Sequence, residues 1–408
     1  MAEITVLDSG VRLVTEKMDS VRSVSVGIWC DTGSVYEKPE EFGMSHYIEH
    51  MLFKGTETRS AFQIADEIDR IGGQMNAFTG KEYTCFYVKS LDHHFRKTAE
   101  VLTDMIEHPS FDPEEMEREK KVVIEEINMN ADDPDDVALD KLEAIVNEGS
   151  GMAHPVLGYK NTVSSFTREM VEEYYYSHYT RDAIVVSVAG SFDYDEVKEY
   201  FSGKFMGLRA SRNSFSDPHV ENPGRKVEVV KDIDQAHLAL GVSLIPAGDS
   251  RKYPVSVLSS IMGGGMSSRL FQTVREQKGL AYSVYTMTGY YRSSGMFVIC
   301  AGVGKDRVKE AIDAIFMELH NLKNGEISQE ELDSSREQLK SVYIFGEESV
   351  QTRMIANGKD LLAYGRCRDQ EEILSGFDKV TLDDLYNVRE MICYPDKYTI
   401  VNVTGKEN

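Results

Sequence analysis

The chain has 408 residues, of which 41% are hydrophobic and 28% charged, and its formal net charge at pH 7 is −23. A single hydrophobic core stops growing near about 250–300 residues, so we expect two domains of about 200 residues each. A surface this acidic repels nucleic acid and anionic membranes, which excludes proteins that bind either, although the same charge also serves general solubility.

Cysteine spacing and hydropathy bear on the cellular compartment. The five cysteines are scattered, odd in number and never spaced as C-x-x-C, so they predict neither a disulfide framework nor a thiolate zinc site. Residues 1–5 lack the basic and apolar regions of a secretory signal, and no apolar run reaches the roughly 18 residues of a membrane-spanning helix. We therefore expect a cytoplasmic protein in a reducing environment.

Segments of the first half recur in the second half at an offset near 215. The alternating strand at 22–28 returns at 236–242, and the strand at 183–190 returns at 398–405. A constant offset over many segments indicates that one α+β unit has been duplicated within the chain.

Each half combines clusters of period-two strands with long helices, such as the helix predicted over 113–130. This pattern favours an α+β fold of two homologous domains, each with a mixed or antiparallel sheet and helices packed on one side. The polar, turn-rich stretch 207–223 marks the junction. We therefore place the N-terminal domain at 1–210 and the C-terminal domain at 223–408.

A short helical segment at 43–53 carries the first candidate site. His46, Glu49 and His50 stand at i, i+3 and i+4, so all three project from one face of that helix. Two histidines one turn apart can bind one Zn²⁺ at the roughly 2.0–2.1 Å of imidazole coordination, with the carboxylate beside a water on the metal. This His-x-x-Glu-His order reverses the common zinc-protease motif, and it predicts a zinc site with Glu49 as the general base.

A catalytic zinc ion takes three protein ligands and keeps one open position. The helix predicted over 113–130 offers candidates, since Glu119 and Glu126 lie seven residues apart on one face. Spacing alone leaves the third ligand open between these two glutamates. The alternative to a metal site is a solvated helix face with two incidental histidines.

At these residues the chain resembles the pitrilysin and mitochondrial processing peptidase family of inverted-motif zinc peptidases (inverzincins), and within that family the short bacterial processing proteases. The resemblance spans nearly the whole chain. It is carried by five segments: 46–56, 72–79, 119–126, 267–271 and 275–282.

The resemblance implies which glutamate binds the metal. In this family the third ligand lies 76 residues past the second histidine, which is Glu126 here. The glutamate seven residues earlier, Glu119, supports a ligand instead of binding the metal. The family pattern thus implies one Zn²⁺ per chain, bound by His46, His50 and Glu126, with Glu49 and Glu119 among the catalytic residues.

The second half lacks these groups. When the two halves are aligned, Ser268, Phe271 and Gln272 take the places of His46, Glu49 and His50, in that order. Val342 takes the place of Glu126. We therefore expect that the C-terminal domain does not bind zinc in this way.

The second half instead has Arg275 and Tyr282. By themselves these residues are typical of a surface ion pair and a core aromatic. The resemblance implies that they reach the active site of a facing half, where a guanidinium and a phenol donate to the developing oxyanion. The run 263–265 lacks the Gly-Lys-Ser/Thr ending of a phosphate-binding loop, and it resembles the glycine-rich loop of the processing peptidase's noncatalytic subunit.

These observations predict a zinc metalloendopeptidase that cleaves short or unfolded peptides bound in extended form inside a clamshell dimer. The peptide would add a strand to an exposed sheet edge. That edge is expected at four residues, namely Asn76, Ala77, Phe78 and Thr79. Family members form clamshells of four homologous domains and this chain has two, so we expect a homodimer in which the partner supplies Arg275 and Tyr282 in trans.

Two other functions share this fold class. One is a noncatalytic scaffold subunit of the core-protein type, and the other is a peptide-binding module whose zinc is structural. The presence of all three ligands argues against the first. Glu49 beside the metal argues against the second, because a structural zinc site is closed and needs no base.

Overall fold

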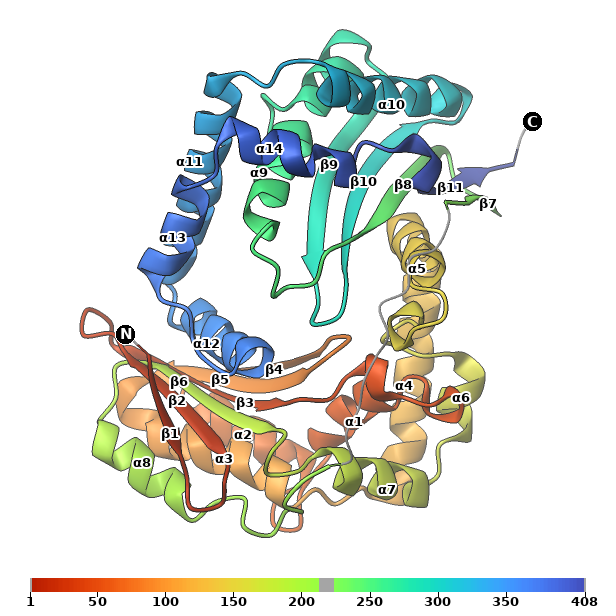
Figure 1. Cartoon of the computed structure of the whole chain (residues 1–408). Helices are drawn as coiled ribbons and strands as arrows, with labels where there is room; N and C mark the ends of the chain where they lie inside the picture. The colour runs from red at the N-terminus through yellow and green to blue at the C-terminus, as the bar shows by residue number, and fades with distance from the viewer. Residues whose placement is uncertain (1, 213–223, 407–408) are drawn as a thin grey trace. The chain divides into compact units, whose positions relative to one another are not determined.

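The computed structural model describes residues 2–212 and 224–406 (Figure 1). These residues form two compact units, and neither unit is contiguous in sequence. The first unit consists of 2–128, 154–212 and 344–369. The second unit consists of 129–153, 224–343 and 370–406.

The first unit is built on a six-stranded sheet in the order β1-β2-β6-β3-β5-β4. Its strands are β1 (Glu3–Val6), β2 (Arg12–Lys17), β3 (Ser23–Cys30), β4 (Gln74–Thr79), β5 (Thr84–Leu91) and β6 (Ile184–Gly190). β2 and β6 run parallel, and the other pairs are antiparallel. β4 lies at one end of the described sheet and pairs with β5 alone.

Helices of the first unit cover this sheet. They are α1 (Met44–Leu52), α2 (Ala61–Arg70), α3 (Phe95–Glu107), most of α4 (Pro113–Asp132), α6 (Lys160–Ser165), α7 (Arg168–His178), α8 (Tyr194–Ser202) and α12 (Val350–Tyr364). Side chains of β3 alternate between the two faces, as a pleated strand requires. Val26 and Ile28 pack with Tyr47 and Ile48 of α1, whereas Trp29 packs on the opposite face against α12.

The second unit contains a five-stranded sheet in the order β7-β11-β8-β10-β9. Its strands are β7 (Lys226–Lys231), β8 (Gln235–Leu244), β9 (Ala281–Tyr290), β10 (Gly295–Gly304) and β11 (Thr399–Gly405). Its helices are α5 (Pro134–Val146), α9 (Lys252–Gly263), α10 (Val308–Asn324), most of α11 (Gln329–Glu347), α13 (Gln370–Asp378) and α14 (Leu382–Val388).

The two sheets have one topology. β2, β6, β3, β5 and β4 of the first sheet correspond in order to β7, β11, β8, β10 and β9 of the second, and the pair β7/β11 is parallel like β2/β6. The first sheet adds only β1 at its end. The α+β class with two mixed sheets is thus confirmed, and the duplication inferred from the sequence is visible in the strand order.

The helix α12 comes from the second half of the chain but packs on the sheet of the first unit, against β3 and β6 (Figure 1). Two glycines make room for the contact. A Cβ on Gly27 would lie 2.2 Å from the Met354 sulfur, and a Cβ on Gly358 would lie 2.2 Å from the Trp29 indole nitrogen. Each glycine therefore lets a large side chain of the facing element fit into the space above its backbone.

The helix α5 makes the reverse exchange. It belongs to the first half of the chain, and it packs on β8 and β11 of the second unit. A Cβ on Gly241 of β8 would lie 2.8 Å from the Leu142 side chain of α5. Sequence periodicity predicted helices on one side of each sheet. That holds for each half's own helices, but the other face carries a helix from the other half.

Because of this exchange, the residues of the two compact units differ from those of the contiguous domains 1–210 and 223–408 expected from the sequence. Residues 129–153 belong to the second unit and residues 344–369 to the first. The reason is burial, since α5 and α12 place their apolar faces on the opposite half's sheet. The junction predicted at 207–223 lies largely outside the described residues.

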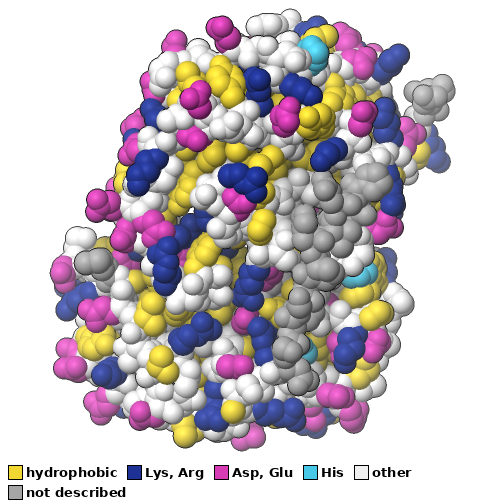
Figure 2. All heavy atoms as spheres, viewed as in Figure 1, with side chains coloured by type: hydrophobic (Ala, Val, Ile, Leu, Met, Phe, Trp, Pro, Cys, Tyr) yellow, Lys and Arg dark blue, Asp and Glu magenta, His cyan; other side chains and the backbone are white. Residues whose placement is uncertain are grey.

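Acidic and basic side chains are interspersed over the face of the molecule drawn in Figure 2. Among the described residues, no helix has the length and apolar character needed to cross a membrane.

Candidate metal centre and active site

A buried carboxylate fixes the start of α1, the helix with the two motif histidines. Gly43 caps the helix with φ of +95°, and a Cβ there would lie 2.7 Å from the Leu157 carbonyl oxygen. The Glu37 carboxylate accepts hydrogen bonds of 2.7 Å from the backbone N–H groups of Gly43 and Ser45. Burial raises the pKa of Glu37 to about 8, although both hydrogen bonds act in the opposite direction.

Three side chains converge where α1 faces α4. His46 Nε2 lies 3.6 Å and His50 Nε2 lies 3.4 Å from Glu126 Oε2, and the ligand atoms of the three residues all lie within 4.8 Å of one another. A tetrahedral zinc ion with bonds of about 2.0–2.1 Å places its ligand atoms about 3.3–3.4 Å apart. The two distances from Glu126 are close to this spacing, so two nitrogens and one carboxylate oxygen fit zinc as three of its four ligands.

The two histidines differ in their surroundings. Burial, together with the nearby His50, lowers the pKa of His46 to about 4, so its ring is neutral as a metal ligand must be. Burial also acts to lower the pKa of His50, but hydrogen bonds with Glu119 and Glu126 outweigh it and raise that pKa to about 9. The His46 Nδ1 atom is buried and has no hydrogen-bond partner among the described residues.

Glu119 contacts the His50 nitrogen that does not face Glu126, and it is not one of the three residues whose ligand atoms converge. Its Oε1 is 2.7 Å from His50 Nδ1, and its Oε2 is 2.7 Å from Lys54 Nζ. The side chain is only 4% exposed, so both contacts are formed away from water. Spacing left the third ligand open between two glutamates, and the structure groups Glu126 with the histidines.

Glu49 projects from α1 beside this cluster. Its Oε2 accepts a hydrogen bond of 2.5 Å from the Thr79 hydroxyl at the end of β4. Burial raises the pKa of Glu49, and the bond from Thr79 opposes that shift. A carboxylate with a raised pKa next to a metal position is suited to accept and return a proton near neutral pH.

The four residues expected at a sheet edge form most of β4. Gln74 and Asn76 are exposed, whereas Met75 and Ala77 pack against the core on the α1 side. Phe78 points to the other face, where its ring lies 5.5 Å from Trp29 and 6.2 Å from Tyr87. The outer edge of β4 thus runs from an exposed end to the hydroxyl that contacts Glu49.

Comparison with known proteins places this geometry in a family. Residues 12–160 match the family model described as Insulinase (Peptidase family M16), and residues 165–339 match the one described as Peptidase M16 inactive domain. The chain is 40% identical to "Uncharacterized zinc protease YmxG" of Bacillus subtilis, over 98% of this chain and 97% of that protein. The chain belongs to peptidase family M16.

Other comparisons agree with this membership. An uncharacterized zinc protease of Streptomyces coelicolor is 36% identical to this M16 chain over 93% of the chain and 85% of that protein. A crystal structure of a protease from Helicobacter pylori has a TM-score of 0.91 at 21% identity, covering 99% of both chains. A Pseudomonas fluorescens structure described as a peptidase M16 inactive domain has a TM-score of 0.92 at 17% identity, covering 100% of this chain and 98% of that one. At these identities the two structures show a shared fold.

In the second unit of this M16 chain, Arg275 and Tyr282 lie together. The Arg275 guanidinium is 5.5 Å from the centre of the Tyr282 ring and 4.7 Å from that of Phe271. Arg275 lies on a π-helix over Phe271–Gln277, a rare conformation that is frequent at functional sites. Tyr282 is the second residue of β9 and is 78% exposed, so its phenol is not a core aromatic.

The positions that correspond to the metal ligands have a different role in the second unit. Ser268 is buried, and the Gln272 amide donates to the Met266 backbone carbonyl. Val342, at the position of the third ligand, is 67% exposed. Two hydroxyl or amide groups and a valine do not make a zinc site.

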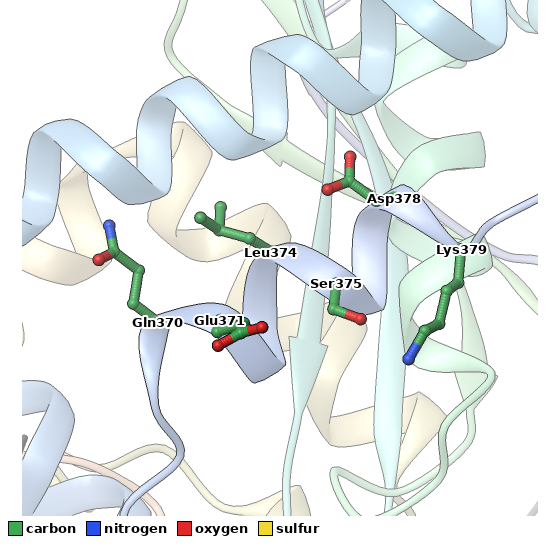
Figure 3. Close-up of a pocket in the computed structure, with 6 residues that line it drawn as sticks. All are labelled: Gln370, Glu371, Leu374, Ser375, Asp378 and Lys379. Atoms are coloured by element: carbon green, nitrogen blue, oxygen red, sulfur yellow. The ribbon is translucent and has the colours of Figure 1, made fainter.

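A pocket of about 600 Å³ lies along α13 of the second unit (Figure 3). It is lined by Gln370, Glu371, Leu374, Ser375, Asp378 and Lys379. None of these residues was predicted as a site residue, and all come from α13 or the position after it. The metal cluster of the first unit therefore remains the candidate active site.

Sequence reasoning missed three contacts of this site. They are the cap that Glu37 forms on α1, the ion pair of Lys54 with Glu119, and the hydrogen bond from Thr79 to Glu49. Lys54 lies inside the motif segment 46–56, but nothing in its spacing identifies Glu119 as its partner. Thr79 was assigned to the edge strand, where alternation puts it on the face of Met75 and Ala77, but nothing in the sequence identifies Glu49 as its partner.

Proposed function

We propose that this protein is a zinc metalloendopeptidase that cleaves short or unfolded peptides bound in extended form. The observation that carries the proposal is the convergence of His46, His50 and Glu126 within 4.8 Å, with Glu49 on the same helix face. Three ligands with one open position and an adjacent base are typical of a catalytic zinc site and not of a structural one.

The metal ligands, Glu49 and Thr79 would have separate roles in peptide hydrolysis. His46, His50 and Glu126 would hold a zinc ion, which would supply a Lewis acid for the scissile carbonyl and the attacking water. Glu49 would take a proton from the attacking water and deliver it to the leaving amine. Thr79 holds the Glu49 carboxylate by its 2.5 Å hydrogen bond, so one oxygen is fixed and the other is available for the proton.

The peptide would bind along the outer edge of β4. Among the described residues this strand pairs with β5 on one side only, so its other side can take up an added strand once the Ala77 N–H, which donates to the Asn76 side chain at 2.9 Å, exchanges that partner for the peptide. Asn76, Ala77 and Phe78 lead along this edge toward Thr79 and hence toward Glu49. Strand addition requires an extended segment, and therefore favours short or unfolded substrates.

We further propose that the enzyme is a homodimeric clamshell in which Arg275 and Tyr282 act on the partner's zinc centre. The support is that one chain has both the ligand set and a pair of the half-buried Arg275 with the exposed Tyr282, and that the family resemblance implies a facing half. An isologous dimer lets the first half of each chain meet the second half of the other. The pair would donate to the oxyanion of the tetrahedral intermediate.

A noncatalytic scaffold is the second candidate, because residues 165–339 match an inactive-domain model. That segment contains none of His46, His50 and Glu126. The residues that would carry catalysis lie within 12–160, which matches the peptidase model. The match therefore favours a chain whose two halves have different roles in catalysis over a chain that has lost its activity.

Metal analysis combined with peptide cleavage tests the function. We expect about one zinc per chain and cleavage of a quenched unfolded peptide, and a strong chelator should abolish the cleavage. Glu49→Gln should retain zinc and lose about 10²–10⁴-fold in kcat. Absence of zinc in protein that cleaves equally well with chelator, or near-normal turnover by Glu49→Gln, would refute the assignment.

Subunit mixing tests the dimer. Glu49→Gln and Tyr282→Phe proteins should each be nearly inactive, and a mixture that exchanges subunits should regain about a quarter of wild-type activity. About half of the dimers are then mixed, and each has one complete site. If labelled subunits exchange and no activity returns, Arg275 and Tyr282 do not act in trans.

A cytoplasmic location is proposed on the state of the cysteines. All five are free, and four of them are buried. Unpaired thiols are typical of a reducing compartment. Fractionation of cells that express a tagged full-length chain would test this.

A further inference from the structure

A lysine just past the metal helix is tied to the metal site through Glu119. Lys54 follows the end of α1 by two residues, and its backbone N–H donates to the Met51 carbonyl at 3.0 Å. Its Nζ lies 2.7 Å from Glu119 Oε2, while its side chain is 30% exposed. The cation thus lies at the boundary between solvent and a carboxylate that is only 4% exposed.

The two oxygens of Glu119 are used by different partners. Oε1 is 2.7 Å from His50 Nδ1, and Oε2 is 2.7 Å from Lys54 Nζ. An ionised carboxylate only accepts hydrogen bonds. Next to it, His50 must therefore donate from Nδ1, which leaves Nε2 as the nitrogen that faces Glu126 and the metal position.

His46 lacks this support. Its Nδ1 is buried and without a hydrogen-bond partner among the described residues, so no side chain there does for His46 what Glu119 does for His50. Of the two histidines, His50 is thus the one whose Nδ1 is held by a side chain among the described residues. Any group that holds Glu119 in place also holds one of the two imidazoles.

We propose that Lys54 is a positioning residue for the metal centre: acting through Glu119, it fixes the ring orientation and the Nδ1–H tautomer of His50. The inference rests on the proposed zinc function and adds a residue to it. A buried carboxylate that loses one of its two partners becomes an uncompensated charge, and the structure around it must relax. Without Lys54, Glu119 is free to turn away from His50, and the site loses preorganisation for the metal.

The primary test is zinc affinity, measured by competition with a chromophoric chelator on protein stripped of metal. Lys54→Met keeps the length of the side chain and removes the charge, and it should weaken zinc binding about 10- to 100-fold. Lys54→Arg keeps a donor cation and should restore affinity to within a few-fold of wild type. Lys120→Met is the matched control, because Lys120 on α4 pairs with the exposed Glu117.

A double-mutant cycle tests whether Lys54 acts through Glu119. Glu119→Gln alone should weaken zinc binding, and adding Lys54→Met to it should cause little further loss, since the relay is already broken. Cobalt absorption provides a second readout, because a misplaced His50 changes the ligand-field bands of bound Co²⁺. If Lys54→Met does not fold, Lys54→Gln and the Arg rescue provide the same comparison.

The outcomes separate this inference from the proposed function. Unchanged zinc affinity in folded Lys54→Met, or full additivity of the two losses, overturns the role of Lys54 while peptidase activity stands. Tight zinc binding that depends on Lys54, in a protein that cleaves no peptide, supports the relay and refutes the peptidase. A wild-type chain that binds neither zinc nor cobalt refutes both.

Discussion

The two halves of the chain share a strand order but differ in chemistry. β2, β6, β3, β5 and β4 have counterparts in β7, β11, β8, β10 and β9, yet a metal cluster is formed by described residues of the first unit alone. The face of α1 with the two histidines corresponds to a segment that continues into a π-helix and holds Arg275. The apolar positions that build a sheet were kept, while a few polar positions were changed. The duplicated fold thus has a candidate metal site in one copy and an arginine–tyrosine pair in the other.

The exchanged helices show the same kind of contrast. Gly27 of β3 and Gly241 of β8 occupy equivalent strands, and each receives a large side chain from the helix of the other half. The first unit adds the reverse pairing, Gly358 of α12 against Trp29. In both units a strand glycine leaves room for a helix from the other half of the chain. The side chain that fills the space is Met354 in the first unit and Leu142 in the second.

The largest expected effect comes from removing the third ligand and testing the corresponding position. Glu126→Gln should weaken zinc binding more than the 10- to 100-fold typical of residues behind the ligands, and activity should disappear with the metal. Val342→Gln places the same side chain at the equivalent, exposed position and should leave both unchanged. Zinc content and peptide cleavage are measured together. Equal loss in the two variants would mean that the halves are not divided in this way.

A second prediction concerns the contribution of the C-terminal half. Tyr282→Phe should lower kcat about 10²-fold, the scale of one lost oxyanion donor, with zinc content unchanged. Tyr285→Phe on the same strand is the control, since the Tyr285 hydroxyl bonds with Cys300 of β10, and its kcat should stay within a few-fold of wild type. Loss of zinc in Tyr282→Phe would point to a folding defect instead of a lost donor.

Docking of the exchanged helix is tested by Gly358→Ala. The new Cβ would lie 2.2 Å from the Trp29 indole nitrogen, and the rigid ring cannot move aside as a flexible chain end does. We expect a loss of about 1–3 kcal/mol in the free energy of unfolding, measured with urea. Gly203→Ala, with nothing within 4 Å of its Cβ, should change stability by less than about 0.5 kcal/mol. Equal stability of the two variants would contradict the tight contact.

The last prediction is a pH dependence of stability from Glu37 at the start of α1. Its pKa rises from about 4.5 in the unfolded chain to about 8 in the folded protein. Between these values the folded state retains a proton that the unfolded state has lost, so stability falls as pH rises from about 5 to 8. Glu37→Gln cannot titrate, so the difference in unfolding free energy, wild type minus variant, should fall with pH in metal-free protein. The slope cannot exceed about 1.4 kcal/mol per pH unit. A difference that rises with pH would mean that the N–H groups of Gly43 and Ser45 outweigh burial.

Local patterns were sufficient for much of the architecture. The alternation at 22–28 and 236–242 predicted the strands now seen as β3 and β8, and the constant offset predicted the duplication. The family membership inferred from the motif segments is confirmed by the comparisons. The roles of the site residues and the dimer stay predictions.

The sequence by itself determined that His46, Glu49 and His50 share a helix face, because a helix repeat makes i, i+3 and i+4 neighbours whatever surrounds them. It did not determine the exchange of α5 and α12, since an apolar helix face fits any sheet with a matching surface. Nor did it reveal the contacts of Glu119 with Lys54 or of Glu49 with Thr79, which join residues 65 and 30 positions apart. Such contacts depend on how distant elements pack, and only the tertiary structure decides that.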